Sequence, residues 1–252
     1  MLIYLLIIYI YLYLYRINTV LVSSFKENNF QEFPSVIITI NKCKSLVKYF
    51  KKSTLLSQLN KTLKQHTDTR WNSKLEMLES VFSQFEDIYN LLLDRDELER
   101  IEGIDVQILS DLVNFLKKFQ VASLCLEGSK QPTLHLVIPW YKALLDHCQV
   151  ITSDNEITKK IKLVVAEKLI EKIKIHELHK LAIFFNPLMK KLKILESGDS
   201  TWVKNEIKRQ CGNLTINDDG VGADSNNDDD DNCMQATLST TISTPIFAKA
   251  FK

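Results

Sequence analysis

Glycine and proline are scarce in this chain, which has only six Gly and five Pro among its 252 residues. Such a chain lacks the frequent tight turns on which an all-β fold depends. No Gly-rich phosphate loop precedes a helix, because the nearest glycine pair, Gly220 and Gly222, lies in a polar stretch near the C-terminus. A G-x-S-x-G nucleophile elbow is also absent. These absences favour a helical fold and give no sign of nucleotide-binding or serine-hydrolase chemistry.

Metal-binding patterns are missing as well. The five cysteines are far apart, with no C-x-x-C pair, and an odd, scattered set predicts reduced thiols in an intracellular protein. His176 and His179 lack the H-E-x-x-H spacing of a zinc protease, so we expect surface histidines. We therefore expect no metal, no cofactor and no small-molecule substrate. The cysteines are Cys43, Cys125, Cys148, Cys211 and Cys233.

Charge divides the chain in two. Residues 1–210 carry 30 Lys and Arg against 24 Asp and Glu, whereas residues 211–252 carry 2 against 7. The second stretch has no apolar periodicity and contains the run Asp228–Asp231, so it is predicted to be a disordered acidic tail. Within the basic part, one stretch holds five lysines and no acid, which indicates either a solvated face or a phosphate-facing surface. These lysines are Lys42, Lys44, Lys48, Lys51 and Lys52.

The strongest periodic pattern begins at Trp71. Seven apolar residues recur at steps of three and four, which predicts one helix with a single buried stripe. Asp68 or Thr69 could cap its first turn. Arg70 falls off the stripe and is expected at the surface, whereas Trp71 is expected in the core. The stripe consists of Trp71, Leu75, Leu78, Phe82, Phe85, Tyr89 and Leu92.

Similar stripes follow along the chain. They predict a helix over residues 35–57, with a strand at Val36–Ile40 as the alternative, and further helices from Asp105, from Pro132 and over 157–173. Pro139 should kink its helix or begin it afresh. One or two helices, broken near Pro187, are expected over 176–195. The predicted fold is all-α, an irregular bundle of roughly six to eight helices over residues 34–210.

Residues 1–25 form an apolar, tyrosine-rich segment interrupted by Arg16, and residues 26–33 read as a polar linker. Fifteen helical residues span about 22 Å, short of a bilayer core of about 30 Å. Three interpretations stay open, namely a membrane anchor, a non-native start, and a buried strand or helix. Because the later stripes are complete without it, we expect the segment to be dispensable for folding of 34–210.

Several blocks resemble a known family. Thr69-Arg70-Trp71-Asn72-Ser73, followed by Met77-Leu78-Glu79, is similar to the "TRWNS…ML" block of hAT-superfamily transposases and their BED-type zinc-finger relatives. The stretch Cys43–Ser53 resembles the helix before that block. Gln131–Leu134 with Val137–Pro139 resembles a downstream region. The stretch Leu181–Leu192 matches imperfectly, with Asn186 and Leu188 where the family has Asp and Arg. The resemblance covers roughly residues 35–195.

The resemblance implies a helical part of an RNase-H-like transposase. That enzyme holds two metals with an Asp, Asp and Glu triad, because both metals must be neutralised and positioned. No residue here matches the triad, the C-x-x-H motif or the BED finger, so we expect a protein that is not an enzyme. By the same resemblance, Arg70 would contact phosphate and Trp71 would stack on a base.

The expected function is accordingly that of a catalytically incomplete, transposase-derived protein similar to zinc finger BED domain-containing proteins. It would bind DNA weakly, or a protein partner, in the nucleus. The alternative is a membrane-anchored helical protein tethered through residues 1–25.

Overall fold

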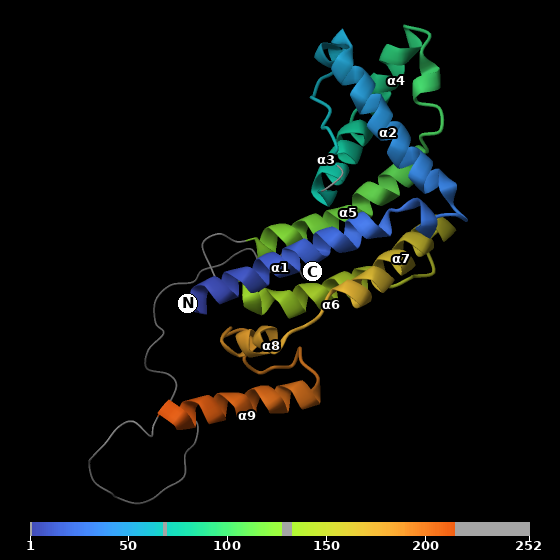
Figure 1. Ribbon diagram of the computed structural model, residues 1–252. Coiled ribbons are helices and arrows are strands. Elements are labelled where there is room, and N and C mark those ends of the chain that lie inside the picture. Colours follow the sequence, from blue (N-terminus) through green and yellow to red (C-terminus); the bar gives the residue numbers. More distant parts are fainter. Residues whose placement is uncertain (1, 68–69, 128–132, 215–252) are drawn as a thin grey trace, which may run out of the picture. The chain divides into compact units, whose positions relative to one another are not determined.

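The computed structural model describes residues 2–67, 70–127 and 133–214, and within them side chains for 12–53, 55–67, 70–127 and 133–211 (Figure 1). These residues form nine α-helices and four short 3-10 turns without a strand, so the all-α prediction is confirmed. Contacts divide the chain into a unit over Met1–Lys208 and a second over Arg209–Lys252. The helices are α1 (Leu2–Ser24), α2 (Pro34–Lys52), α3 (Trp71–Phe82), α4 (Phe85–Leu93), α5 (Val106–Leu126), α6 (Val137–His147), α7 (Glu156–Lys172), α8 (Glu177–Phe184) and α9 (Ser197–Leu214).

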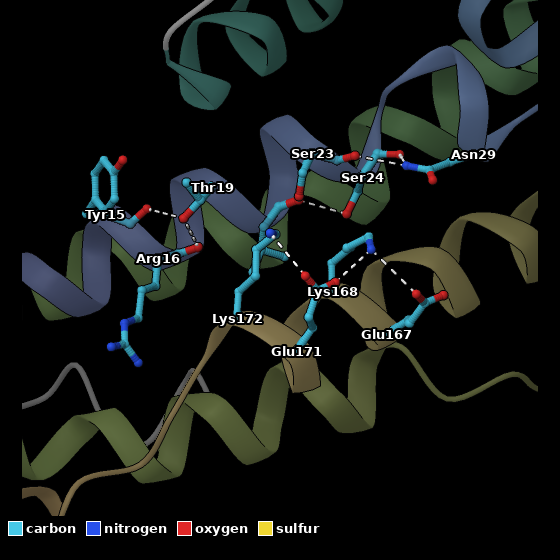
Figure 2. A network of polar contacts seen from close by, with 11 residues as sticks. Tyr15, Arg16, Thr19, Ser23, Ser24, Asn29, Glu167, Lys168, Glu171 and Lys172 are labelled. Atoms are coloured by element: carbon cyan, nitrogen blue, oxygen red, sulfur yellow. Dashed lines mark hydrogen bonds and ion pairs between the residues drawn. The ribbon is translucent and has the colours of Figure 1, made fainter.

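Helix α1 runs alongside α5 and α7 and contributes to the core (Figure 1). Its side chains Tyr13, Ile17, Val20 and Leu21 are all at most 2% exposed. Asn29 ends the helix by donating to the carbonyls of Ser23 and Ser24 at 2.9 and 2.8 Å (Figure 2). Of the three interpretations of this segment, the packing favours a buried helix, and it argues against dispensability. The side chains of residues 1–11 lie outside the described part of the chain.

The stretch expected to be a linker is also packed. Residues Glu27–Asn29 form a 3-10 turn, and the buried Phe30 ring stacks on Phe25 with 5.9 Å between centroids. Lys160 of α7 reaches Glu32 at 3.2 Å. Among the described residues, no helix is long and apolar enough to cross a bilayer.

Helix α2 resolves the ambiguity at Val36–Ile40 in favour of a helix. Pro34 occupies its first turn, where the missing N–H costs nothing. Its apolar residues Val36, Cys43 and Leu46 are at most 1% exposed. The helix ends at Lys52, earlier than expected, and a 3-10 turn over Thr54–Gln58 follows.

The single helix predicted from Trp71 to Leu92 is wrong, because the chain turns at Ser83–Gln84 and separates α3 from α4. The Gln84 side chain is 4% exposed and accepts a hydrogen bond from the Lys61 N–H at 2.8 Å. It thereby ties the turn to a segment 23 residues earlier. The break moves the buried face: Phe82 and Tyr89 are 36% and 41% exposed, whereas Ile88 and Leu92 are fully buried.

The later helices begin largely where the sequence predicted. Asp105 caps α5 by accepting from the N–H groups of Gln107 and Ile108 at 2.9 and 3.0 Å. Before it, Gly103 has a φ of +86°, a conformation that glycine adopts without a Cβ penalty. A 3-10 turn over Leu134–Leu136 leads into α6, so Pro139 stands in the first turn of a fresh helix. Asn155 caps α7.

The last helices share a small apolar cluster. Ile138, Ile183, Leu192 and Val203 are buried together there. Helix α8 ends at Phe184, as the predicted break near Pro187 requires. Helix α9 continues to Leu214, four residues into the predicted tail, and residues 215–252 fall outside the described part of the chain.

Candidate nucleic-acid interface

Arg70 and Trp71 stand where α3 begins. Arg70 is the N-cap residue but makes no side-chain cap, and the two expected caps, Asp68 and Thr69, lie outside the described residues. Instead, Ser73 closes the approach to the helix. Its hydroxyl accepts from the Thr67 N–H at 2.9 Å and donates to the Arg70 carbonyl at 2.7 Å.

The two residues differ in exposure. Trp71 is 7% exposed, as its place in the stripe predicts, and its backbone N–H donates to the Asn18 side chain of α1 at 3.1 Å. Arg70 is exposed. A stacking platform needs an open indole face, and Trp71 presents little of one, whereas the Arg70 guanidinium is accessible. The binding roles of both residues stay predictions.

Asn72 links α3 to α5. Its side-chain oxygen accepts from Gln120 at 3.1 Å, while its amide donates to Glu76 at 3.0 Å. Together with the Trp71 and Ser73 bonds, this contact makes Trp71-Asn72-Ser73 a junction between α3, α1 and α5. The sequence did not predict the contacts of Asn18 and Gln120 with α3. Each of these residues lies about fifty positions from its partner, and no local pattern marks it.

The five lysines of α2 lie mainly on its solvent side. Lys44, Lys48, Lys51 and Lys52 are exposed, and Lys42 is half-buried. The helix contains no Asp or Glu. Lys51 donates to the neutral amide of Gln65 at 3.2 Å, which brings the segment containing the exposed Lys61 and Lys64 to the same end of α2. We call Lys44, Lys48, Lys51 and Lys52 the lysine face.

An acidic residue beside α2 is already engaged. The Tyr49 hydroxyl donates to Glu97, and the Arg100 guanidinium donates to the same carboxylate at 2.7 Å. These hydrogen bonds, Tyr49 first, lower the pKa of Glu97. Arg100 also lies over the Tyr49 ring, 3.7 Å from its centroid. The cluster attaches the 3-10 turn Leu98–Arg100 to α2 and neutralises Glu97 locally.

His176 is exposed, as expected, but His179 is buried, which corrects our expectation for that residue. The His176 ring accepts from the Leu178 N–H at 3.2 Å, and the His179 ring accepts from the His176 N–H at 3.0 Å, so the two form a capping box for α8. His179 is 3% exposed. Burial, with the charges of His176 and Arg16, lowers its pKa to about 4. Both rings therefore act first as helix caps.

Within the described ranges, no group of three or more His, Cys, Asp or Glu residues is arranged to hold a metal ion. The four described cysteines form no disulfide. Burial raises the pKa of Cys43 and of Cys148 to about 12, so both thiols stay protonated.

Comparison with known proteins gives two kinds of relative. The chain is 30% identical to the transposable element Hobo transposase of Drosophila melanogaster over 174 residues, which are 66% of this chain and 26% of that protein. It is 29% identical over 120 residues to zinc finger protein 618 of Mus musculus and of Homo sapiens, covering 48% of this chain and 13% of each relative. No family model matches the chain. The chain thus spans about a quarter or less of the relatives it matches, and it is distantly related to a transposase.

Proposed function

We propose that this chain is the helical part of an hAT-transposase-derived protein and that it binds the nucleic-acid backbone through the lysine face of α2. The distant relationship to Hobo transposase supports the transposase origin, and the TRWNS block supports the finer hAT and BED-type assignment. A nuclear location follows from such a role. The proposal does not include DNA cleavage by the chain itself, because no residue matches the metal-binding triad of the family.

The observation that carries this proposal is the one-sided charge of α2. Lys48 and Lys52 are exposed and have no ion-pair partner among the described residues, and the bond of Lys51 goes to a neutral amide. Exposed lysines such as Lys48 and Lys52 attract a polyanion, and each phosphate contact releases a condensed counterion. A face of this kind binds by charge and recognises no particular base sequence.

The test measures DNA affinity against salt concentration by fluorescence anisotropy. The variant is Lys48→Gln, Lys51→Gln and Lys52→Gln combined. At low salt it should bind mixed-sequence DNA at least about tenfold more weakly than the wild type. The slope of log K against log[salt] should become shallower by about 3, since each lost phosphate contact removes about 0.9.

The matched control changes three lysines of α7 to Gln, namely Lys159, Lys168 and Lys172. Each of these pairs with a glutamate, at 2.7, 2.7 and 3.4 Å, so the net charge changes equally while the attraction for phosphate changes less. Equal losses in both triple variants would show that only net charge matters. If the slope of log K against log[salt] is unchanged in the α2 variant, the lysine face does not contact phosphate.

The absence of cleavage is tested separately. Purified protein should leave supercoiled DNA intact in magnesium or manganese. Metal-dependent nicking that survives purification and is lost on replacing one carboxylate would contradict this part of the proposal.

A further inference from the structure

The segment that joins α8 to α9 presents two large apolar side chains to solvent (Figure 1). Leu188 is 80% exposed and Phe185 is 71% exposed, more than the other large apolar side chains in the described part of the chain. Single exposed apolar residues are common on protein surfaces, whereas neighbouring ones rimmed by polar residues are typical of interaction sites. The residues around these two side chains therefore indicate what they contact.

Three exposed lysines follow Phe185 and Leu188, and none of them makes an ion pair with another described residue. The sequence contains no Asp or Glu over residues 178–195. The charge beside the two apolar side chains is therefore positive, which suits a polyanion. We call this set of residues the α8–α9 tip. It consists of Phe185, Leu188, Lys190, Lys191 and Lys193.

Hydrogen bonds and a buried anchor hold the backbone of the tip. The Asn186 side-chain oxygen accepts from the Leu188 N–H at 3.0 Å. Further along, Leu192 is 1% exposed and belongs to the apolar cluster of the last helices. Lys142 of α6 donates to the Ile194 carbonyl at 2.6 Å and fastens the far end of the segment. A surface held in this way loses less conformational entropy when a ligand binds to it.

Phe185 offers the open aromatic face that Trp71 lacks. Its ring makes a T-shaped contact with the Phe184 ring, with 5.7 Å between centroids. Phe184 is half-buried and packs against the apolar cluster, so it orients the Phe185 ring while most of that side chain stays exposed. A nucleic-acid base can stack on such a ring whatever its identity, because every base has a π face.

We propose that the α8–α9 tip binds single-stranded nucleic acid, with a base stacked on Phe185, Leu188 beside that base, and the phosphates facing the three lysines. This inference rests on the function proposed above, and it adds a contact to bases that the lysine face of α2 does not provide. A flat ring beside lysines matches the two parts of a nucleotide, its base and its phosphate. Anionic lipid is the other polyanion with which such a tip could interact, and it is one outcome of the test.

The experiment measures the affinity of the full chain for two labelled single strands of equal length by fluorescence anisotropy. One strand has mixed sequence, and the other carries abasic sites in place of its nucleotides. Because both strands have the same backbone charge, the ratio of their affinities reports contacts to bases. The wild type should prefer the strand with bases by about fivefold or more, the effect of one stacked base.

Three substitutions of Phe185 separate stacking from general apolar contact. Phe185→Ser should abolish most of the preference for bases and leave the affinity for the abasic strand within about twofold of the wild-type value. Phe185→Tyr keeps a flat ring and should retain the preference, whereas Phe185→Leu keeps only apolar surface and should not. Since the side chain is exposed, all three variants should melt near the wild-type temperature.

The matched control is Leu163→Ser, which removes an apolar side chain of α7 that is 58% exposed, and it should not change the preference. Replacing the three lysines of the tip by Gln should weaken binding of both strands about equally, because phosphate contacts do not depend on the bases.

The α2 triple variant separates the two proposals. Loss of the preference in Phe185→Ser supports the tip, even if the α2 variant binds DNA as the wild type does and the lysine face fails. A wild type without a preference for bases overturns the tip, as does a preference that survives in Phe185→Ser, whatever the α2 variant does. Sedimentation with phosphatidylserine vesicles, lost in Phe185→Ser and retained in Phe185→Leu, together with equal binding of both strands, would assign the tip to lipid instead.

Discussion

Helices α2 and α7 carry five lysines each, yet they use them differently. Every lysine of α7 reaches an acid: Lys168 and Lys172 share Glu171 (Figure 2), and Lys162 binds Asp154 at 2.7 Å. Helix α2 has no acid of its own, and the nearby Glu97 is engaged by Tyr49 and Arg100. Lysine content alone therefore does not identify a binding face; the neighbouring carboxylates decide whether the charge is available to a ligand.

The largest effect is expected from removing residues 1–25, which takes away the partner of α7. Four buried side chains of α1 would be lost, at about 1.5–3 kcal/mol each, on the order of 6–12 kcal/mol in total. That equals the whole stability of a typical domain. The truncated chain should lose cooperative unfolding in circular dichroism melts. A truncated form that still melts cooperatively near the wild-type temperature would show that α7 does not need α1.

The next largest loss of stability is expected from replacing Trp71, in the core between α3 and its neighbours. Trp71→Ala on α3, which packs against α2, should lower the free energy of unfolding by about 3–5 kcal/mol, as deletion of a buried large aromatic does. Arg70→Ala is the control, and its free energy of unfolding should stay within about 0.5 kcal/mol of the wild-type value. Denaturant midpoints and single-stranded DNA affinity should be measured on both variants. A stable Trp71→Ala protein that binds DNA several-fold more weakly would instead favour the stacking role.

One lysine on each helix shows the difference between α7 and α2. Lys162 of α7 is 9% exposed and pairs with Asp154, so Lys162→Met should cost about 2–3 kcal/mol by leaving that carboxylate without its ion pair. Lys48→Met on α2 removes an exposed side chain and should change stability by less than about 0.5 kcal/mol. Chemical denaturation measures both. If both variants lose the same free energy of unfolding, the lysines of α7 and α2 do not differ in their ion pairing.

The smallest effect is a pH dependence just beyond α7. His179 has a folded-state pKa of about 4, below the ordinary value of 6.5, so the unfolded chain binds the extra proton first. Stability is complete above about pH 6.5 and falls as the pH drops toward 4. At pH 5 the loss should be about 2 kcal/mol relative to pH 8. His179→Gln keeps an acceptor for the capping bond and should flatten this part of the stability curve. If the curve is unchanged, another group causes the dependence.

Periodicity predicted the helices well where burial is one-sided. The starts at Pro34 and Asp105 and the buried stripes of α5 and α7 follow from local spacing and capping, which need no knowledge of distant residues. The pattern misled at Ser83–Gln84, because the apolar spacing continues through a turn that Gln84 holds against Lys61. It also missed the roles of Asn18 and Gln120, whose partners on α3 are remote in sequence.

The all-α class, the burial of Trp71 and the lysine run of α2 follow from local sequence, because helix formation and amphipathic burial depend on neighbours within a turn or two. Contacts made on folding determine which lysines pair with a carboxylate, that residues 12–24 pack as a core helix, and that His176 and His179 cap α8. Each of these depends on contacts between residues far apart in the chain. Such contacts leave no periodic trace in a single sequence.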